Sequence, residues 1–487
     1  MPYSMTQRDN SFSEAAAALL GDRGFTTDHD LLQPWLTDWR GRFTGKAIGM
    51  ASPASTQEVA ELVKLCADYG VPIVPQGGNS GMSGGATPDS SGNAVLLSLR
   101  RMDAFREFDV EARQITCDAG VILQNLHEKV GKERLRFPLT LGGKGSATIG
   151  GLISTNAGGT QVLRHGTMRA QVLGLEAVMA DGSVLDALTP LKKDNRGFDL
   201  KQLLIGSEGT LGIVTAATLQ LLPEIADRRV VWAGLSSLQN ARELFLHCEA
   251  TAAQQLEGFE VLPDHSLQAV LAHLPASRSP LGSQYPWYAL IELTANDEDV
   301  DMLARKTESL MNSALDASLI DDAVIAVNET QAETFWLLRD SIAPAERAIG
   351  PAMQHDISVP VPLMADFVEK VSPEIEQRFP GTKAVAFGHL GDGNVHFHVL
   401  APSGSDRHSW ESADAKVISK FVHDKVTEWG GSISAEHGIG QIRRDELGRL
   451  ADPARLSVMR NIKTALDPKG IMNPGKLVPL AKQAASP

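Results

Sequence analysis

The spacing of apolar residues changes along the chain and divides it into four parts. Residues 1–42 carry helical spacing, which predicts a helical N-terminal segment. Residues 43–223 are rich in glycine and contain short apolar runs bounded by turn residues, a pattern typical of buried strands. In residues 224–426 longer amphipathic helices alternate with strand-like runs, and residues 427–487 return to turns and helices. This order of patterns predicts an α+β protein with more than one domain.

Individual elements follow from the same pattern. A helix is expected over residues 56–68, because its apolar residues lie at helical spacing and Thr56 can act as its N-cap. Two longer helices are expected over residues 298–315 and 329–349. Strands are expected at residues 72–75, 94–97, 174–179, 287–293 and 383–387.

Charge and cysteine content exclude several classes of protein. The formal net charge is −14, which disfavours nucleic acid as a partner. Cys66, Cys117 and Cys248 are scattered, which argues against an iron–sulfur cluster, a thiolate zinc site and a disulfide framework. The first residues lack the apolar core of a secretory signal, and no apolar run is long enough to span a bilayer. We therefore expect a cytoplasmic protein, with peripheral attachment to the inner face of the membrane left open.

Two glycine-rich segments carry the first candidate binding chemistry. They cover residues 75–85 and 142–151, and a further short run follows at 154–159. Glycine permits positive φ and lets successive backbone N–H groups converge on an anion such as a pyrophosphate. Neither segment matches a Walker A loop or the dinucleotide fingerprint of a Rossmann unit. The alternative is that both are glycine-rich turns without a ligand.

Residues 81–85 also match the GxSxG pattern of a hydrolase nucleophile elbow, with Ser83 as the nucleophile. That elbow needs a strand that runs directly into it. Here a glycine-rich loop, residues 77–81, separates the expected strand from the serine. The sequence therefore disfavours a hydrolase.

A second candidate site lies in the predicted hairpin of residues 383–400, where two alternating runs flank an Asp-Gly turn signal. Alternation places His396 and His398 on the face opposite to Val395, Phe397 and Val399. A tight turn would bring His389 back toward His396, and Glu436 could add a carboxylate. Two imidazoles and one carboxylate leave positions open for substrate, as at catalytic zinc, and would also suit non-heme iron.

His437 directly follows Glu436 and is a natural candidate for a general base, because a neutral imidazole titrates near physiological pH. The alternative for all these histidines is that they are packed or solvated on a strand and bind no metal.

Six motifs along the chain carry a resemblance to a known family: residues 75–85, 140–159, 204–213, 388–396, 435–438 and 473–477. In these motifs and their order, the chain resembles the FAD-linked oxidase family of the vanillyl-alcohol-oxidase type, and within it the D-2-hydroxyglutarate and D-lactate dehydrogenases. The resemblance implies a two-part, PCMH-type FAD-binding domain over residues 43–223 and an α+β substrate domain with an antiparallel sheet over 224–426. It further implies a C-terminal helical segment, residues 427–487, that returns to the flavin.

The resemblance implies that FAD is bound without a covalent bond, because the flavin-linking histidine of some relatives falls near Asn79 and is missing here. It also implies that residues 77–81 cradle the pyrophosphate. The residues expected to contact FAD are Pro75, Gly77, Gly78, Asn79, Ser80, Gly81, Met82, Pro138, Thr148, Gly151, Ser154, Thr155, Asn156, Gly158, Glu208, Gly212, Ile213 and Asn473.

The metal and catalytic residues also follow from the resemblance. His389, His396 and Glu436 match zinc ligands of hydroxyglutarate dehydrogenases, and Mn²⁺ or Fe²⁺ would suit the same donors. His437 matches the base, and Arg339 matches an arginine that binds the substrate carboxylate.

Three substrate positions depart from the hydroxyglutarate pattern. A threonine of the family is replaced by Ala343, a lysine by Gln354 and an asparagine by His398. We expect Gln354 and His398 to line the substrate site with Arg339 and His437. The loss of one cation means that recognition of hydroxyglutarate itself does not follow from the family.

The expected activity is oxidation of a D-2-hydroxy acid, of the D-lactate or D-2-hydroxyglutarate type, to the 2-oxo acid. Hydride would pass to flavin N5 with metal-assisted loss of the hydroxyl proton. The alternatives are a metal-independent FAD oxidase of a sugar or alcohol, and a flavoprotein subunit of an electron-transfer complex. We expect a homodimer and an external electron acceptor, which could be a quinone, a cytochrome or an electron-transfer flavoprotein.

Overall fold

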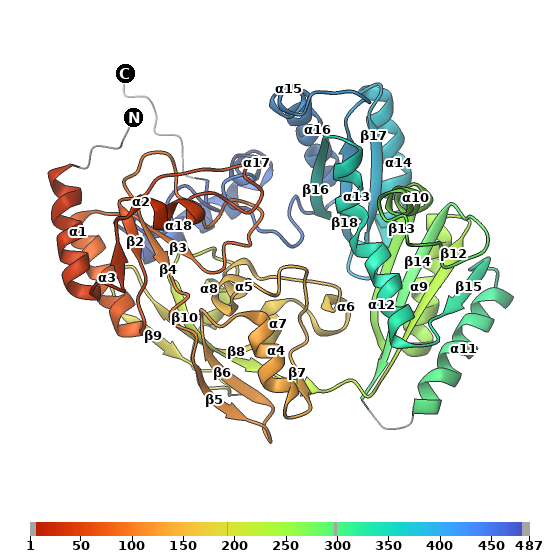
Figure 1. Cartoon of the computed structure of the whole chain (residues 1–487), viewed down its shortest axis with the longest axis horizontal. Helices are drawn as coiled ribbons and strands as arrows, with labels where there is room; N and C mark the ends of the chain where they lie inside the picture. Colours follow the sequence, from red (N-terminus) through yellow and green to blue (C-terminus); the bar gives the residue numbers. More distant parts are fainter. Residues whose placement is uncertain (1–5, 192, 297–299, 480–487) are drawn as a thin grey trace. The chain divides into compact units, whose positions relative to one another are not determined.

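The computed structural model describes residues 6–191, 193–296 and 300–479. Its contacts divide the chain into two compact units. The first contains residues 1–159, 165–223 and 436–487, and the second contains residues 160–164 and 224–435. In Figure 1 the first unit runs from red to yellow and includes the dark blue C-terminal part, whereas the second is green to light blue.

The first sheet of the first unit has four strands in the order β1-β2-β4-β3. β2 and β3 both pair in parallel with β4, so a crossover must join them. That crossover is α3 (Thr56–Tyr69), which ends at Gly70 in a left-handed conformation. Ser55, and not the predicted Thr56, is the N-cap: its side chain accepts from the N–H of Glu58. The strands are β1 (Phe25–Thr26), β2 (Gly49–Ala51), β3 (Ile73–Gln76) and β4 (Val95–Ser98).

The second sheet of this unit has five antiparallel strands in the order β5-β6-β10-β8-β9. They are β5 (Phe105–Asp109), β6 (Gln114–Asp118), β8 (Val172–Val178), β9 (Val184–Ala187) and β10 (Ile213–Gln220). Helices that matter for the site are α5 (Ile149–Thr155) and, near the C-terminus, α17 (Arg444–Leu450) and α18 (Pro453–Leu466). The remaining elements of the unit are α1 (Gln7–Leu20), α2 (His29–Leu32), η1 (Gln33–Trp35), α4 (Leu123–Gly131), β7 (Leu135–Arg136), α7 (Met168–Gln171), α8 (Lys201–Leu204) and β11 (Leu222–Pro223), and α6 (Val162–His165) spans its boundary with the second unit.

The second unit is built on one antiparallel sheet of seven strands, in the order β15-β12-β14-β13-β17-β18-β16. The predicted antiparallel substrate-domain sheet is therefore confirmed. The strands are β12 (Asp227–Leu235), β13 (Leu256–Pro263), β14 (Trp287–Ala295), β15 (Asp322–Ile325), β16 (Ala352–Ser358), β17 (Lys383–His389) and β18 (Asn394–Leu400).

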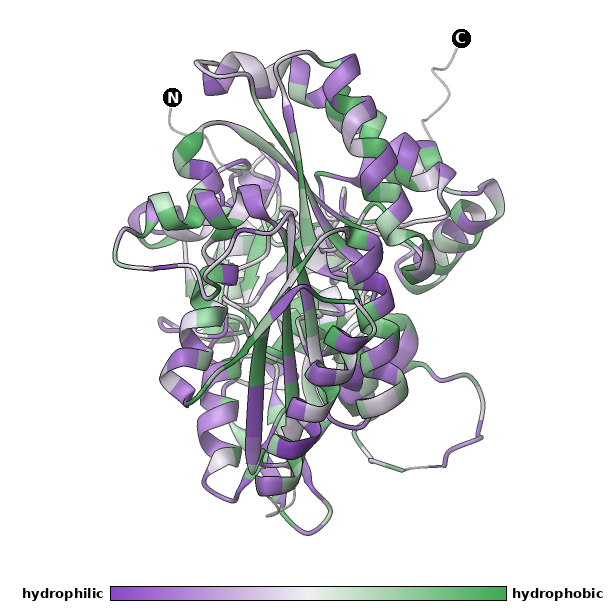
Figure 2. Ribbon diagram, turned by 90° about the vertical axis from the view of Figure 1, so that its right-hand side faces the viewer, coloured by the Kyte–Doolittle hydropathy of each residue, from purple (hydrophilic) through white to green (hydrophobic). Residues whose placement is uncertain are grey.

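The two faces of this sheet are covered by different helices. One face packs on α9 (Leu238–Ala252), α11 (Val300–Asp316), α14 (Met364–Arg378) and α16 (Asp414–Glu428). The other packs on α10 (Asp264–His273), α12 (Glu329–Asp340) and α13 (Ile342–Ile349). Helices on the side that faces the viewer in Figure 2 carry both purple and green stretches, as expected for helices that bury only one side. A short helix, α15 (Arg407–Ser412), precedes α16.

One of the two long predicted helices differs from the structure. The single helix expected over residues 329–349 is interrupted at Ser341 and forms α12 and α13. Pro344 explains the break, since proline has no N–H to donate to the carbonyl of Asp340 and its ring crowds the preceding turn. The helix expected over residues 298–315 is α11, whose first two predicted positions lie outside the described residues.

Candidate functional site

The first glycine-rich loop follows β3 and presents unpaired donors. Among the residues that the structure describes, no acceptor binds the backbone N–H groups of Gly78, Asn79, Ser80 or Gly81. Asn79 has a positive φ of 53°, and its side chain donates to the carbonyl of Thr37 at 2.9 Å. Successive N–H groups of this kind form an anion site, so the loop fits a pyrophosphate.

The two predicted glycine segments pack directly on one another. A Cβ on Gly78 would lie 1.7 Å from the carbonyl oxygen of Ser146, and one on Gly77 would lie 2.1 Å from Oγ1 of Thr148. No side chain fits at either position. Glycine is therefore needed at both positions for close packing, and the contact holds the N–H groups of the loop in place.

The second segment forms the capped helix α5. Oγ1 of Thr148 accepts from the N–H of Gly151, and Asn156 ends the helix with a φ of 50°. Oγ1 of Thr155 donates to the carbonyl of Gly151 at 3.1 Å, and Oδ1 of Asn156 accepts from the N–H of Arg169. These side chains, predicted to contact FAD, thus also fix the backbone of the segment. Of the other predicted contacts, Ile213 is buried at the start of β10.

Glu208 joins the C-terminal segment to the glycine-rich segments within the first unit. Its carboxylate accepts from the N–H groups of Ile439 at 2.7 Å and Gly440 at 2.8 Å. Nδ2 of Asn473 donates to the carbonyls of Glu208 and Gly85. Burial raises the pKa of Glu208. The structure gives these two predicted cofactor residues a structural function of their own.

Ser83 is buried and does not form a nucleophile elbow. Its Oγ lies 2.9 Å from the carbonyl oxygen of His437 and 3.0 Å from that of Gly438, and it accepts from Arg443 at 2.9 Å. A hydroxyl committed to these groups holds the chain around His437. The sequence argument against a hydrolase is therefore supported by the geometry.

The histidine hairpin is formed as predicted. Phe387 of β17 pairs with His396 of β18, and the ring centroids of His389 and His396 lie 5.6 Å apart. Val395, Phe397 and Val399 belong to the core beneath α9, α11, α14 and α16, so the alternation of β18 is confirmed. His396 and His398 lie on the opposite face of the sheet, toward α12 and α13.

His389, His396 and Glu436 form a group that fits a metal ion. One ligand atom from each lies within 4.8 Å of the others. Glu436 follows Ala435, the last residue of the second unit, whose N–H donates to the carbonyl of Asp356 on β16. Burial and the charge of Arg339 hold the pKa of His396 well below its usual value, so its ring keeps a free lone pair. Two nitrogens and one carboxylate suit zinc, and also manganese or iron.

A buried carboxylate that the sequence analysis missed lies beside this group. Glu260 on β13 is paired in register with His389, and its Oε1 lies 2.5 Å from Nδ1 of that ring. Its Oε2 accepts from Nε and from one terminal nitrogen of Arg339, at 3.0 Å and 2.9 Å. Burial alone would raise the pKa of Glu260, but Arg339 and His389 hold it well below its usual range. The feature of the sequence that could have revealed Glu260 is its position as a charged residue within the apolar run of β13.

The other predicted substrate residues have partners of their own. Arg339 is held by Glu260, and its other terminal nitrogen lies 3.7 Å from Asp340. Nδ1 of His398 contacts Oε2 of Glu346 on α13. Gln354 pairs in register with His398, and its Nε2 is buried without a partner among the described residues. Gln354, the position where the lysine of the family is missing, therefore lies next to the buried pair of His398 and Glu346.

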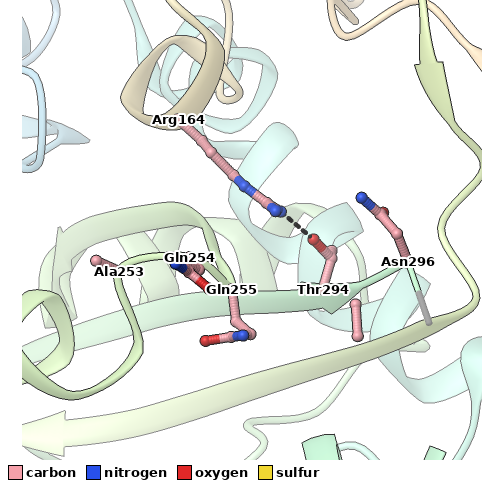
Figure 3. Close-up of a pocket in the computed structure, with 7 residues that line it drawn as sticks. Arg164, Ala253, Gln254, Gln255, Thr294 and Asn296 are labelled. Carbon is pink, nitrogen blue, oxygen red and sulfur yellow. Dashed lines mark hydrogen bonds between the residues drawn. The ribbon is translucent and has the colours of Figure 1, made fainter. Parts of the chain in front are cut away.

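A separate hollow of about 540 Å³ lies on the second unit and contains none of the predicted site residues. Figure 3 shows Arg164 reaching into it and donating to Oγ1 of Thr294 at 2.7 Å. Arg164 also donates to Glu257 at 2.8 Å, so it fastens residues 160–164 to the sheet. The lining residues are Arg164, Ala253, Gln254, Gln255, Thr294, Ala295 and Asn296.

Comparison with known proteins agrees with these observations. Residues 47–188 match the family described as FAD binding domain, and residues 225–477 match that described as FAD linked oxidases, C-terminal domain. The mitochondrial D-2-hydroxyglutarate dehydrogenase of Arabidopsis thaliana is 35% identical over 476 residues, which cover 98% of this chain and 82% of that protein. The Bos taurus enzyme of the same name is 36% identical over 480 residues, covering 98% and 85%.

The solved structure of p-cresol methylhydroxylase with substrate bound aligns with a TM-score of 0.74 at 16% identity and covers 98% of both chains. Fold and site together define a flavin-dependent oxidoreductase. The chain belongs to the FAD-linked oxidase family.

Within the described part of the chain, none of the helices combines the length and the apolar character that crossing a bilayer would need.

Proposed function

We propose that this protein is an FAD-dependent dehydrogenase that oxidises a D-2-hydroxy acid to the 2-oxo acid with the help of a divalent metal. The observation that carries the proposal is the convergence of His389, His396 and Glu436 in a chain of the FAD-linked oxidase family. Two relatives named as D-2-hydroxyglutarate dehydrogenases span more than nine-tenths of this chain, which supports a 2-hydroxy acid as substrate.

Different residues of the chain would bind FAD and the metal. The N–H groups of residues 78–81 would bind the pyrophosphate of FAD without a covalent link. His389, His396 and Glu436 would hold the metal, for which zinc is our first choice. When bound, FAD accepts the hydride at N5 and the metal polarises the substrate hydroxyl.

His437 would take the proton of the substrate hydroxyl on a ring nitrogen, and the Cα hydrogen would leave as hydride. Arg339, whose Nε and one terminal nitrogen donate to Glu260, would orient the substrate carboxylate through its guanidinium group. Electrons would then pass to an external acceptor, which could be a quinone, a cytochrome or an electron-transfer flavoprotein. Oxidation of one substrate yields one 2-oxo acid, one reduced flavin and one proton.

The side chain of the substrate is the least constrained part of the proposal. Where the family pattern has a cation, this chain has a buried polar group formed by Gln354, His398 and Glu346. We therefore include substrates with and without a second carboxylate in the test.

The test is anaerobic reduction of the flavin by the purified full-length chain, with metal content measured on the same sample. D- and L-lactate and D- and L-2-hydroxyglutarate would be added separately. Bleaching by at least one D-acid and by neither L-acid, together with about one metal per chain, is expected.

Bleaching by a sugar or simple alcohol in metal-free protein would instead identify a metal-independent oxidase. A flavin that no substrate reduces until another protein is added would identify a subunit of an electron-transfer complex. Either result would contradict the proposal.

A further inference from the structure

One buried carboxylate serves both the proposed metal site and the proposed substrate arginine. Glu260 has an exposed fraction of 0% and lies on β13, directly opposite His389 on β17. The N–H of Leu390, the next residue, donates to the carbonyl of Phe259 at 3.2 Å, so backbone pairing continues past the pair. The two side chains are thus brought together by strand register and not by a mobile loop.

The surroundings of the His389 ring distinguish its two nitrogen atoms. Nδ1 lies 2.5 Å from Oε1 of Glu260, a carboxylate oxygen that can only accept. Nε2 lies 3.5 Å from a terminal nitrogen of Arg339, which can only donate. An acceptor on one side and a donor on the other favour a proton on Nδ1 and a lone pair on Nε2.

We propose that Glu260 is a positioning residue that fixes His389 in the Nδ1–H form, so that Nε2 is presented to the metal, and that aims Arg339 at the same place. The inference rests on the metal site of the proposed function. A carboxylate that accepts from the outer nitrogen of a metal-binding imidazole sets the tautomer and orientation of the ring and raises its basicity as a ligand.

A second buried glutamate on the neighbouring strand provides a matched control. Glu292 on β14 accepts from Arg228 at 2.8 Å and from Trp336 at 2.7 Å. Like Glu260, it is a buried carboxylate that holds an arginine, but its partners among the described residues, Arg228 and Trp336, are not expected ligands of the metal. Neutralising it removes a comparable ion pair without touching the histidines.

The first experiment compares zinc affinity in the wild type, Glu260→Gln and Glu292→Gln. Each full-length, FAD-loaded protein is stripped of metal and titrated with Zn²⁺ in competition with a fluorescent chelator. Glu260→Gln should bind Zn²⁺ about 10- to 100-fold more weakly than the wild type. Glu292→Gln should bind it as tightly as the wild type.

The outcomes separate this inference from the proposed function. A wild type that binds no Zn²⁺ would overturn the metal centre and the inference with it. Equal Zn²⁺ affinities in the wild type and Glu260→Gln would overturn the inference and leave the proposed function standing. The same conclusion would follow if Glu292→Gln lost as much Zn²⁺ affinity as Glu260→Gln.

A second measurement does not need a stable variant. Histidine labelled with ¹⁵N in metal-free wild-type protein reports which ring nitrogen of His389 carries the proton, and His389→Asn identifies its signals. We expect the proton on Nδ1. A proton on Nε2 would overturn the inference even if Glu260→Gln failed to fold, because a carboxylate that merely buries Arg339 need not set this tautomer.

Discussion

Several residues that match a catalytic or binding motif also stabilise the fold around the proposed site. Ser83 matches a nucleophile motif, yet its hydroxyl is committed to the carbonyls of His437 and Gly438. These contacts hold the backbone at the proposed base, His437, and at the residue that follows it. The side chain of His437 can therefore be changed while its backbone remains fastened, which makes the base assignment testable.

Replacing His437 with alanine should slow anaerobic flavin reduction by about 10²-fold or more, because the hydroxyl proton would lose its acceptor. FAD should remain bound in stoichiometric amount, since the backbone contact to Ser83 does not depend on the side chain. Stopped-flow reduction with the best D-acid measures the effect. An unchanged rate in a yellow variant would remove His437 from the mechanism.

The glycine contacts at Gly78 make a second prediction at this scale. Gly78→Ala would place a methyl group 1.7 Å from the carbonyl of Ser146, so the loop must move and its N–H groups with it. We expect at least about 10-fold weaker FAD binding, the cost of one or two misplaced hydrogen bonds to an anion. Equilibrium titration of the deflavinated protein with FAD gives the affinity.

Gly142→Ala is the matched control for this change. It lies in the second glycine segment, and a Cβ there would meet nothing within 4 Å. Wild-type affinity in Gly142→Ala together with a loss in Gly78→Ala is expected. Equal affinities in the two variants would show that the close contact does not shape the cofactor loop.

At the scale of elements, polar contacts decide how the sheets and helices are joined. Glu176 on β8 accepts from Thr56 of α3 at 2.6 Å, from Thr215 of β10 at 2.8 Å and from Arg106 of β5 at 3.0 Å. It therefore connects the crossover helix of the four-stranded sheet to the five-stranded sheet. Burial alone would raise the pKa of Glu176, but these donors lower it below its usual value.

This pKa shift predicts a pH-dependent contribution to folding. Because the folded state holds Glu176 ionised, the contribution is present above the usual glutamate pKa of about 4.3 and is lost as the pH falls below it. The free energy of unfolding should fall more steeply in the wild type than in Glu176→Gln as the pH is lowered from about 5 to about 3. Urea denaturation at a series of pH values measures both slopes.

Glu107→Gln on β5 controls for the loss of a negative charge, since its side chain is exposed. The free energy of unfolding of Glu107→Gln should change with pH as steeply as that of the wild type. A Glu176→Gln variant with the same pH dependence as the wild type would contradict the assigned contribution.

For the whole molecule, the loops predicted to bind FAD and the hairpin histidines His389 and His396 belong to different units of the chain, whereas Glu436 and His437 belong to the first unit. The loop of residues 77–81 and its partner segment are in the first unit, and β17 and β18 are in the second. FAD binding and metal binding should therefore be separable, although the proposed reaction needs both.

Removal of the metal with a chelator should abolish reduction of the flavin by the D-acid while FAD remains bound. Added Zn²⁺ or Mn²⁺ should restore the reaction, because it returns the group that polarises the hydroxyl. Flavin absorbance before and after dialysis reports cofactor content, and anaerobic mixing reports reduction. Full activity in protein shown to be free of metal would remove the metal from the mechanism.

Local sequence was sufficient for features that depend on neighbouring residues. The alternation in residues 395–399 predicted which face of β18 carries the histidines, and the Asp-Gly turn predicted that His389 folds back toward His396. The break between α12 and α13 was missed by our prediction of a single helix, although Pro344 marks it in the sequence, because proline cannot continue the hydrogen-bond ladder of the preceding helix. These features are set by backbone geometry within a few residues.

Tertiary structure decided what distant segments share. The sequence analysis did not predict the strand that carries Glu260, and only the β13–β17 register puts its carboxylate against His389. Likewise, spacing cannot tell that Arg339 is held by Glu260, or that His398 is held by Glu346 from α13. A buried charge needs a partner, but which partner it finds depends on how strands and helices separated by tens of residues are packed together.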